Sequence, residues 1–342
     1  MKQYRIAQIG CGMISRSHFQ AIAMLDNAHV AAVADIVPEK ARKAGESQGC
    51  PSFASLRELL QSMPDIDVCL LATPTHTHAD LVEICAAFGK PTICEKPPEL
   101  RIPDVKRLRS AVVSSGIPYM TAQVVRFWPG YTELKRMMAD GEFGNIYMSY
   151  FSRCSQLQRW DNDWLFDPEK GGGAMFDMMV HDIDFMHHLF GPAKKVYAVA
   201  SKDHTDCYAN VFASIEYKNG AKGVAETSFT MQSGYPFTMS AKIMGSRATA
   251  EFVYRAGFDI NHRDGATCTL DIYRAGREPE RASPSQYNAY AAEIAYFLDC
   301  LDKGIQPAIV MPEENVEVVR VVNAIERSAI AGLPVDMDAF DR

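Results

Sequence analysis

Four ionisable side chains recur along one strongly apolar segment of the chain, residues 171–191. Asp177, His181, Asp184 and His188 follow one another at steps of four, three and four residues, which places them in one stripe on a helix. Most of the other residues are large and apolar, so we expect the helix to be buried. Because an unpartnered buried polar group costs about 2–7 kcal/mol, the stripe needs a partner or a ligand.

An imidazole beside a carboxylate is suited to moving protons. Histidine titrates near neutral pH, so His181 can accept a proton and return it. Asp177, one helical turn earlier, can orient the ring. The alternative is that the two side chains satisfy each other as a structural pair. Asp182, Asp184 and His188 are candidates either for ligand contact or for bracing the helix.

A glycine turn near the N-terminus has the form of a phosphate-binding loop. Residues 4–10, YRIAQIG, predict a buried strand, and helical spacing follows at once. Gly10 permits the tight turn, and Gly12 lets a pyrophosphate approach the backbone at the helix N-terminus. Ser15 stands where the fingerprint has its third glycine, so the motif is imperfect and is weak by itself.

An acidic residue ends the next predicted strand, HVAAVAD, at residues 29–35. Asp35 follows the glycines by about 20 residues, the distance at which an acid binds the adenosine ribose hydroxyls. The alternative is that Asp35 caps a helix that starts near Pro38. Because strand, turn, helix, strand and acid occur in order, we favour the cofactor interpretation. A carboxylate here repels a 2′-phosphate, which favours NAD over NADP.

Strand-like and helix-like segments alternate through the first third of the chain. Further apolar runs cover 66–73, 91–96 and 117–123, and helical spacing covers 38–46, 55–62, 76–88 and 103–115. This alternation predicts βαβ units and a doubly wound parallel sheet. Ligands of such sheets bind at the carboxyl ends of the strands.

The segment ATPTHTHAD, residues 72–80, follows one of these strands. His76 and His78 have the spacing of a possible metal pair, but no acid-rich partner motif lies nearby. The alternative is that Thr75 or Thr77 caps the next helix and the imidazoles line a loop.

The segment CEKPPEL, residues 94–100, follows another strand and places Glu95 and Lys96 at its carboxyl end. Pro97 and Pro98 then hold the chain in an extended path. A lysine is usually a solvated surface group. One placed between a buried strand and two prolines is held in a fixed position, which suggests a function.

The bulk composition excludes several classes of protein. The chain has 342 residues, 47% of them hydrophobic, and a net charge of −7, which favours two domains and argues against nucleic acid or anionic membrane as partners. No apolar run approaches the roughly 20 residues of a membrane helix, and the N-terminus passes directly into a strand pattern. Nine cysteines without a C-x-x-C pair indicate a reducing, cytoplasmic location.

Taken in order, IGCGMISRSH, Asp35, ATPTHTHAD, CEKPP and GGGAMFDMMVHDID resemble the glucose–fructose oxidoreductase / inositol dehydrogenase (Gfo/Idh/MocA) family over nearly the whole chain. The resemblance implies an α/β protein with two domains. Residues 1–123 would form an NAD(P)-binding Rossmann domain. Residues 124–342 would form a substrate-binding and oligomerisation domain with a large, open, mainly antiparallel sheet. Ser15 and the doubled proline depart from the family pattern.

The same resemblance implies the activity and the site. The family oxidises or reduces secondary alcohols of sugars and inositols with NAD or NADP. Its E-K-P lysine corresponds to Lys96, and its D-x-x-x-H pair corresponds to Asp177 and His181, which we take as the catalytic residues. The cofactor is expected to contact Gly10, Gly12, Met13, Ile14, Asp35, Thr73, Pro74, His78, Glu95, Lys96 and Gln123. The substrate is expected to contact Lys96, Arg126, Arg153, Trp164, Asp177 and His181, with Trp160, Tyr287 and Tyr290 as weaker candidates.

Several of these substrate contacts have an equally good alternative in packing. Aromatic faces stack on pyranose C–H faces, and arginine binds vicinal hydroxyls, but both residue types also serve as core or surface. No metal is expected in the site.

The remaining two thirds of the chain predict a second sheet. Helices are expected over 129–140, 174–190, 287–302 and 312–331, and strands over 194–201, 208–217, 221–230, 238–245 and 248–254. Asn219-Gly220 is a strong hairpin signal, and the last two helices are expected to return towards the domain junction. Residues 262–268 and 276–286 read as loops. One face of such a sheet covers helices, and the other requires a partner, which predicts a homodimer or homotetramer.

Three other functions fit parts of the sequence. A metal hydrolase could use His76, His78 and His181. A catalytically silent sensor could keep the fold and bind NAD and a sugar. A reductase of imines or linear tetrapyrroles could use the same fold without the full set of Lys96, Asp177 and His181.

Overall fold

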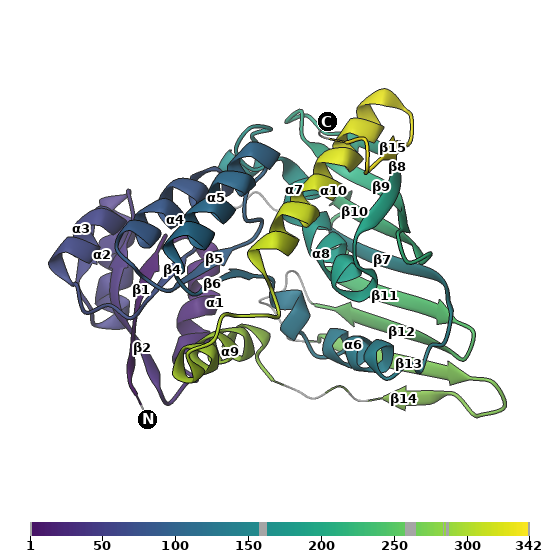
Figure 1. The fold of residues 1–342 in the computed structure, drawn as a ribbon, viewed down its shortest axis with the longest axis horizontal. Coiled ribbons are helices and arrows are strands. Elements are labelled where there is room, and N and C mark those ends of the chain that lie inside the picture. The colour runs from purple at the N-terminus through teal and green to yellow at the C-terminus, as the bar shows by residue number, and fades with distance from the viewer. Residues whose placement is uncertain (1, 157–162, 257–264, 283, 285–286, 341–342) are drawn as a thin grey trace. The chain divides into compact units, whose positions relative to one another are not determined.

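The computed structural model describes residues 2–156, 163–256, 265–282, 284 and 287–340. The chain divides into two compact units (Figure 1), Met1–Phe127 with Tyr287–Val316, and Trp128–Gln286 with Glu317–Arg342. From the sequence we expected one division, after residue 123, with residues 124–342 in a second domain. The segment 287–316 belongs to the first unit because helix α9 (Ala289–Lys303) packs against helix α1 (Met13–Ile22) and the 3-10 turn Val124–Phe127.

The first unit is built on a six-stranded sheet in the order β3-β2-β1-β4-β5-β6, and every pairing in it is parallel. The doubly wound fold is confirmed. The strands are β1 (Tyr4–Ile9), β2 (Ala28–Ala34), β3 (Ser52–Phe53), β4 (Val68–Leu71), β5 (Thr92–Glu95) and β6 (Tyr119–Ala122). The helices between them are α1, α2 (Pro38–Gln48), α3 (Leu56–Ser62), α4 (His78–Ala87) and α5 (Ile102–Ser115).

Burial on both faces explains why these strands are continuous apolar runs. All four residues of β4, Val68–Leu71, are fully buried. The amphipathic helices complete the core with Leu59, Val82, Leu108 and Val112. Because the strand order reverses between β1 and β4, the carboxyl ends of these two strands form the switch point at which ligands of such sheets bind.

The second unit contains a nine-stranded sheet in the order β14-β13-β12-β11-β7-β10-β9-β8-β15. Only the β7–β10 pairing is parallel among the described strands, so the expected mainly antiparallel sheet is confirmed. The strands are β7 (Ile146–Gln156), β8 (Ala193–Lys202), β9 (Tyr208–Tyr217), β10 (Lys222–Met231), β11 (Thr238–Gly245), β12 (Ala248–Arg255), β13 (Thr267–Arg274), β14 (Glu280–Ala282) and β15 (Val335–Asp336).

Five of the described strands are absent from the sequence prediction. The short strands β3 and β15 and the longer strands β7 and β13 were not expected, and β14 lies in the segment 276–286 that reads as a loop. Polar and charged residues alternate with apolar ones in these strands, and the sheet pairs them through the backbone. Pairing with a neighbouring strand therefore overrides weak local propensity.

The helix expected over 174–190 is two helices, α7 (Gly173–Asp177) and α8 (Met179–Phe190). The break falls at Met178, where the His181 amide bonds to the Met178 carbonyl, three residues back instead of four. Asp177 therefore ends one helix, and His181 lies in the first turn of the next.

Helices cover one face of the nine-stranded sheet (Figure 1), among them α7, α8 and α6 (Tyr131–Ala139). In β9 the buried residues are Ala209, Val211, Ala213, Ile215 and Tyr217, and they alternate with half-exposed or exposed residues, as a strand covered on one face requires. The last part of α10 (Pro312–Ala331) also packs here, since Ser328 Oγ accepts a hydrogen bond from the Ala198 amide at 2.9 Å.

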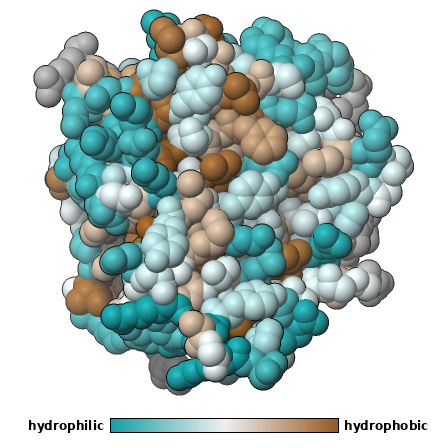
Figure 2. All heavy atoms as spheres, turned by 90° about the vertical axis from the view of Figure 1, so that its right-hand side faces the viewer, coloured by the Kyte–Doolittle hydropathy of each residue, from teal (hydrophilic) through white to brown (hydrophobic). Residues whose placement is uncertain are grey.

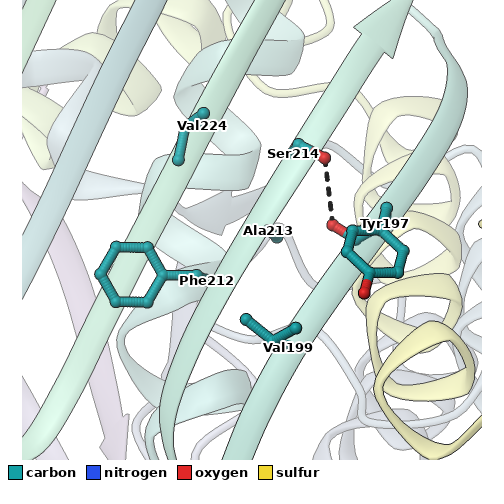
Figure 3. A pocket seen from close by; sticks show the side chains of 6 residues that line it. All are labelled: Tyr197, Val199, Phe212, Ala213, Ser214 and Val224. Carbon is teal, nitrogen blue, oxygen red and sulfur yellow. Dashed lines mark hydrogen bonds between the residues drawn. The ribbon is translucent and has the colours of Figure 1, made fainter. Parts of the chain in front are cut away.

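The other face of this sheet is open and partly apolar (Figure 2). Its exposed apolar side chains include Tyr197, Val199 and Phe212, which are 40%, 54% and 46% exposed. These three residues, together with Ser214 and Val224, line a shallow hollow of about 140 Å³ across β8, β9 and β10 (Figure 3). Among the described residues, no helix has the length and apolar character needed to cross a bilayer.

A buried carboxyl group anchors the loop after β5 to the start of α4. The Glu99 side chain is 3% exposed, and its Oε1 accepts a hydrogen bond from the Ala79 amide at 2.7 Å. Thr77 precedes α4, but its hydroxyl donates to the Pro74 carbonyl and does not cap the helix. Glu99 therefore takes the capping role that the sequence assigned to a threonine.

This carboxyl group makes the stability of the protein depend on pH. Burial raises the pKa of Glu99 from 4.5 to about 7. Between these values the folded chain holds a proton that the unfolded chain has lost. The free energy of unfolding therefore falls as pH rises, by up to about 1.4 kcal/mol per pH unit.

We expect Glu99→Gln to remove this part of the pH dependence, because the amide oxygen still accepts from Ala79 and carries no charge. Urea denaturation between about pH 5 and pH 7.5 should show the variant gaining stability relative to the wild type as pH rises. Glu278 is exposed, so Glu278→Gln serves as the control. Its free energy of unfolding should change with pH as that of the wild type does. If the free energy of unfolding changes with pH equally in Glu99→Gln and the wild type, Glu99 is not the source of the pH dependence.

Candidate active-site residues

The glycine turn after β1 has the geometry that a dinucleotide requires. Gly10 has φ +88°, and a Cβ there would lie 2.3 Å from the Ala72 carbonyl oxygen, so only glycine fits. A Cβ on Gly12 would meet nothing within 4 Å, which leaves the backbone open to a ligand. The first turn of α1 contains no acidic residue and no side-chain cap. Its amides and dipole are therefore available to an anion.

Ser15 explains how the imperfect fingerprint is tolerated. Its side chain is buried, and its Oγ donates to the Gly12 carbonyl at 2.5 Å. The third position of the motif packs inside the unit, so a small residue suffices there. Met13 and Ile14 lie in the first turn of α1, next to the glycines.

Asp35 is fixed beside the glycine turn. Its Oδ2 accepts from the Cys11 amide at 2.8 Å, and its Oδ1 accepts from the Val37 amide at 2.8 Å. Helix α2 begins at Pro38 after Val37 and has no side-chain cap, so Asp35 is not its N-cap residue. The carboxylate therefore belongs to the glycine turn.

The segment after β4 forms the other side of this switch point. Thr73 and Pro74 are half-exposed there, and His78 is fully buried. The ring nitrogens of His78 lie 3.0 Å from the Thr73 and Pro97 carbonyl oxygens. Burial lowers the pKa of the His78 imidazole, so the ring is neutral and donates to one of them. His78 thus ties the two loops together, an arrangement that does not suit a metal ligand.

The alternative metal pair gains no support from the rest of the described chain. The His76 side chain is exposed on the surface of the first unit. The described residues contain no group of three or more His, Cys, Asp or Glu side chains arranged to hold a metal ion.

Lys96 is held at the carboxyl end of β5. It is half-buried, while Glu95 before it and Pro97 after it are buried, and the Lys96–Pro97 peptide is cis. Glu95 lies 2.7 Å from His18 through Oε1 and accepts from the Lys96 amide through Oε2 at 2.9 Å. The lysine side chain thus projects from a backbone that is fixed on both sides.

Gln123 is a buried amide at the carboxyl end of β6. It is 0% exposed, and neither Oε1 nor Nε2 has a hydrogen-bond partner within the described part of the chain. An unsatisfied buried polar group costs about 1–3 kcal/mol. A ligand with an amide group, such as nicotinamide, would satisfy it.

The two candidate arginines are both committed to internal ion pairs. The Arg126 side chain is 0% exposed, lies 2.9 Å from Glu314 and donates to the Ile309 carbonyl. Arg153 is 2% exposed and binds both carboxylate oxygens of Asp182, at 2.9 and 3.2 Å. These contacts favour the packing alternative over substrate contact for both arginines, and they assign Asp182 to bracing α8.

The four ionisable residues of the stripe on 171–191 are only partly accessible to solvent. Asp177, His181 and His188 are half-buried, while Asp184 is 0% exposed. The His188 ring lies 6.1 Å from the Phe185 ring, and its carbonyl accepts from Lys135. Asp177 and His181 are thus the two members at the α7–α8 break that remain accessible together.

The aromatic candidates fall into different environments. Trp164 is half-buried in the 3-10 turn Asp163–Phe166, and Tyr287 is 41% exposed before α9. Tyr290 is buried, with its ring edge-on to His18. Trp160 lies outside the described residues.

Sequence reasoning did not single out His18. It lies on the buried face of α1 with Ser15, Ala21 and Ile22, a spacing of three and four residues. The available signal was a histidine in the apolar stripe of a predicted helix.

Comparison with known proteins agrees with this geometry. Residues 4–123 match the family described as "Oxidoreductase family, NAD-binding Rossmann fold", and residues 131–251 match the "GFO/IDH/MocA C-terminal domain". The chain is 24% identical to D-apiose dehydrogenase of Paraburkholderia graminis, over 100% of this chain and 92% of the relative. It is 27% identical to inositol 2-dehydrogenase of Rhizobium meliloti, over 89% and 90%.

A solved structure of levoglucosan dehydrogenase, in complex with NADH and L-sorbose, superposes with a TM-score of 0.87. The two chains are 24% identical, over 98% of this chain and 99% of the other. The two family models match residues of both the first and the second sheet of the chain, one parallel and the other mainly antiparallel. The chain therefore belongs to the Gfo/Idh/MocA family of oxidoreductases.

Proposed function

We propose that the protein is an NAD-dependent dehydrogenase that moves hydride between nicotinamide and a secondary alcohol or ketone of a sugar, an inositol or a sugar derivative. The observation that carries the proposal is the position of Lys96. It is half-buried at the carboxyl end of β5, fixed by Glu95 and Pro97, in a sheet whose glycine turn is open to a dinucleotide. The relatives named apiose and inositol dehydrogenases support the substrate class.

In this proposal each side chain has one task. When bound, nicotinamide supplies the hydride acceptor for the alcohol carbon. His181 accepts the hydroxyl proton and returns it in the reverse reaction. Asp177 orients the imidazole and binds a neighbouring hydroxyl. The Lys96 ammonium donates to the same oxygen and stabilises the negative charge that develops there.

We expect Lys96→Ala and His181→Ala each to lower turnover by at least about a hundredfold, through loss of charge stabilisation and of acid–base catalysis. NADH formation across a panel of polyols and sugars with NAD measures this. Lys106→Ala and His204→Ala, both exposed residues, are the matched controls and should keep wild-type turnover. Unchanged turnover in both site variants would refute the mechanism, and NADH binding without turnover of any panel member would favour the silent sensor.

Asp35 is proposed to select NAD over NADP. Asp35→Asn keeps an oxygen that can accept from the Cys11 amide but removes the charge that repels a 2′-phosphate. We expect the ratio of kcat/KM for NADP to that for NAD to rise by about tenfold, the factor that 1.4 kcal/mol represents. Asp35→Ala also removes the support of the glycine turn and should weaken NAD binding further. An unchanged ratio in Asp35→Asn would mean that Asp35 does not read the ribose.

The open face of the nine-stranded sheet is proposed to pair with a second copy of the chain, which supports a homodimer or a dimer of dimers. Its exposed Tyr197, Val199 and Phe212 form the kind of patch that a partner covers. We expect Phe212→Asp to lower the mass measured by sedimentation equilibrium to that of one chain, and the exposed Lys106→Asp to leave it unchanged. A wild-type protein that sediments as a monomer would contradict this proposal.

A further inference from the structure

His18 links the helix that follows the glycine turn to the proposed catalytic lysine. The ring is 0% exposed on α1, and its Nε2 lies 2.7 Å from Glu95 Oε1 at the end of β5. The other carboxylate oxygen, Oε2, accepts from the Lys96 amide at 2.9 Å. The Glu95 carboxylate therefore bonds to the His18 imidazole through one oxygen and to the Lys96 backbone amide through the other.

The charge on this carboxylate needs both partners. Burial raises the pKa of Glu95, but the hydrogen bond with His18 and the proximity of His18 and Lys96 outweigh that effect, and the net shift is downward. The group is therefore ionised at neutral pH although the residue is only 6% exposed. A buried charge is stable only when it is paired and hydrogen-bonded, so loss of the His18 donor would force Glu95 to move or to take up a proton.

The orientation of the imidazole is itself fixed. The Tyr290 ring of α9 meets the His18 ring edge-on, with centroids 5.5 Å apart and planes at 88°. This aromatic contact and the bond to Glu95 hold the imidazole from two sides. The chain of contacts runs from Tyr290 through His18 and Glu95 to the Lys96 backbone, and all four residues belong to the first unit.

We propose that His18 is a positioning residue for Lys96, acting through the Glu95 carboxylate. It couples α1, whose N-terminus faces the dinucleotide, to the strand end that presents the ammonium to the reacting oxygen. The inference rests on the proposed role of Lys96. Because a misplacement of about 1 Å can cost about a hundredfold in rate, release of this anchor lowers turnover without removing any group that touches substrate.

A purely structural role is the alternative. In that case, loss of the His18–Glu95 contact would lower stability, and the kinetic constants of the remaining folded enzyme would not change. A measurement other than stability is needed to distinguish a positioning role from a structural one. Separate values of kcat and KM provide it.

The experiment compares His18→Phe and His18→Gln with the wild type on a polyol or sugar that the wild type oxidises. Phenylalanine keeps a ring against Tyr290 but donates no hydrogen bond, and glutamine places an N–H donor near the position of Nε2. We expect His18→Phe to lower kcat by at least about tenfold, while KM for the alcohol and Kd for NADH, measured by protein fluorescence, stay within about twofold. His18→Gln should recover kcat to within about threefold of the wild type.

The Lys96→Ala background tests whether His18 acts through the lysine. There, His18→Phe should change the residual turnover by less than about twofold, because non-additive effects mark residues that act as one unit. If His18→Phe does not fold, as judged by circular dichroism, His18→Gln and Glu95→Gln take its place. Glu95→Gln should then lower kcat by at least about tenfold with KM unchanged.

Wild-type kcat in His18→Phe, an equal loss in His18→Phe and His18→Gln, or full additivity with Lys96→Ala would each overturn the inference. These outcomes leave the proposed function standing as long as Lys96→Ala alone lowers turnover by at least about a hundredfold. Unchanged turnover in both Lys96→Ala and His181→Ala is the separate result that would remove the proposed function itself.

Discussion

The contact between the Gly10 backbone and the Ala72 carbonyl is the constraint on which the first unit depends. The ends of β1 and β4 approach so closely that no side chain fits between them. This approach lies at the switch point of the sheet, and in the same turn the Cys11 amide donates to the Asp35 carboxylate. The amides at the start of α1 are then left open towards the same edge. The phosphate-binding character of the loop thus follows from a steric fact about two neighbouring strands.

Several of the buried charges among the described residues are paired. The Glu95 carboxylate bonds to the His18 ring and accepts from the Lys96 amide, Asp182 accepts from Arg153 through both carboxylate oxygens, and Glu314 accepts from Arg126. Breaking a buried pair by removing one partner typically costs about 3–5 kcal/mol. Such pairs therefore fix the conformation of the segments that carry them. In the first unit they fix the strand end with Lys96, and in the second unit they fix α8, which carries His181.

The second sheet separates two tasks by the alternation of side chains along its strands. One face packs against α7 and α8 and thereby positions Asp177 and His181. The other face carries Tyr197, Val199 and Phe212 towards the solvent. Because successive residues of a strand point to opposite faces, the same strands can pack against α7 and α8 on one face and expose apolar side chains on the other.

The sequence by itself determined the alternation of the longer strands and helices in the first unit, the glycine turn, Asp35, and the family, because these depend on local spacing and residue type. It placed Lys96 at a strand end for the same reason, but it predicted one continuous helix for Asp177 and His181. The tertiary structure alone decided that Arg126 and Arg153 are internal, that Glu99 caps α4, and that His18 meets Glu95. It also decided that β7, β13 and β14 join the sheet and that the helix breaks at Met178. These features arise from contacts between residues far apart in the chain, and no local pattern encodes them.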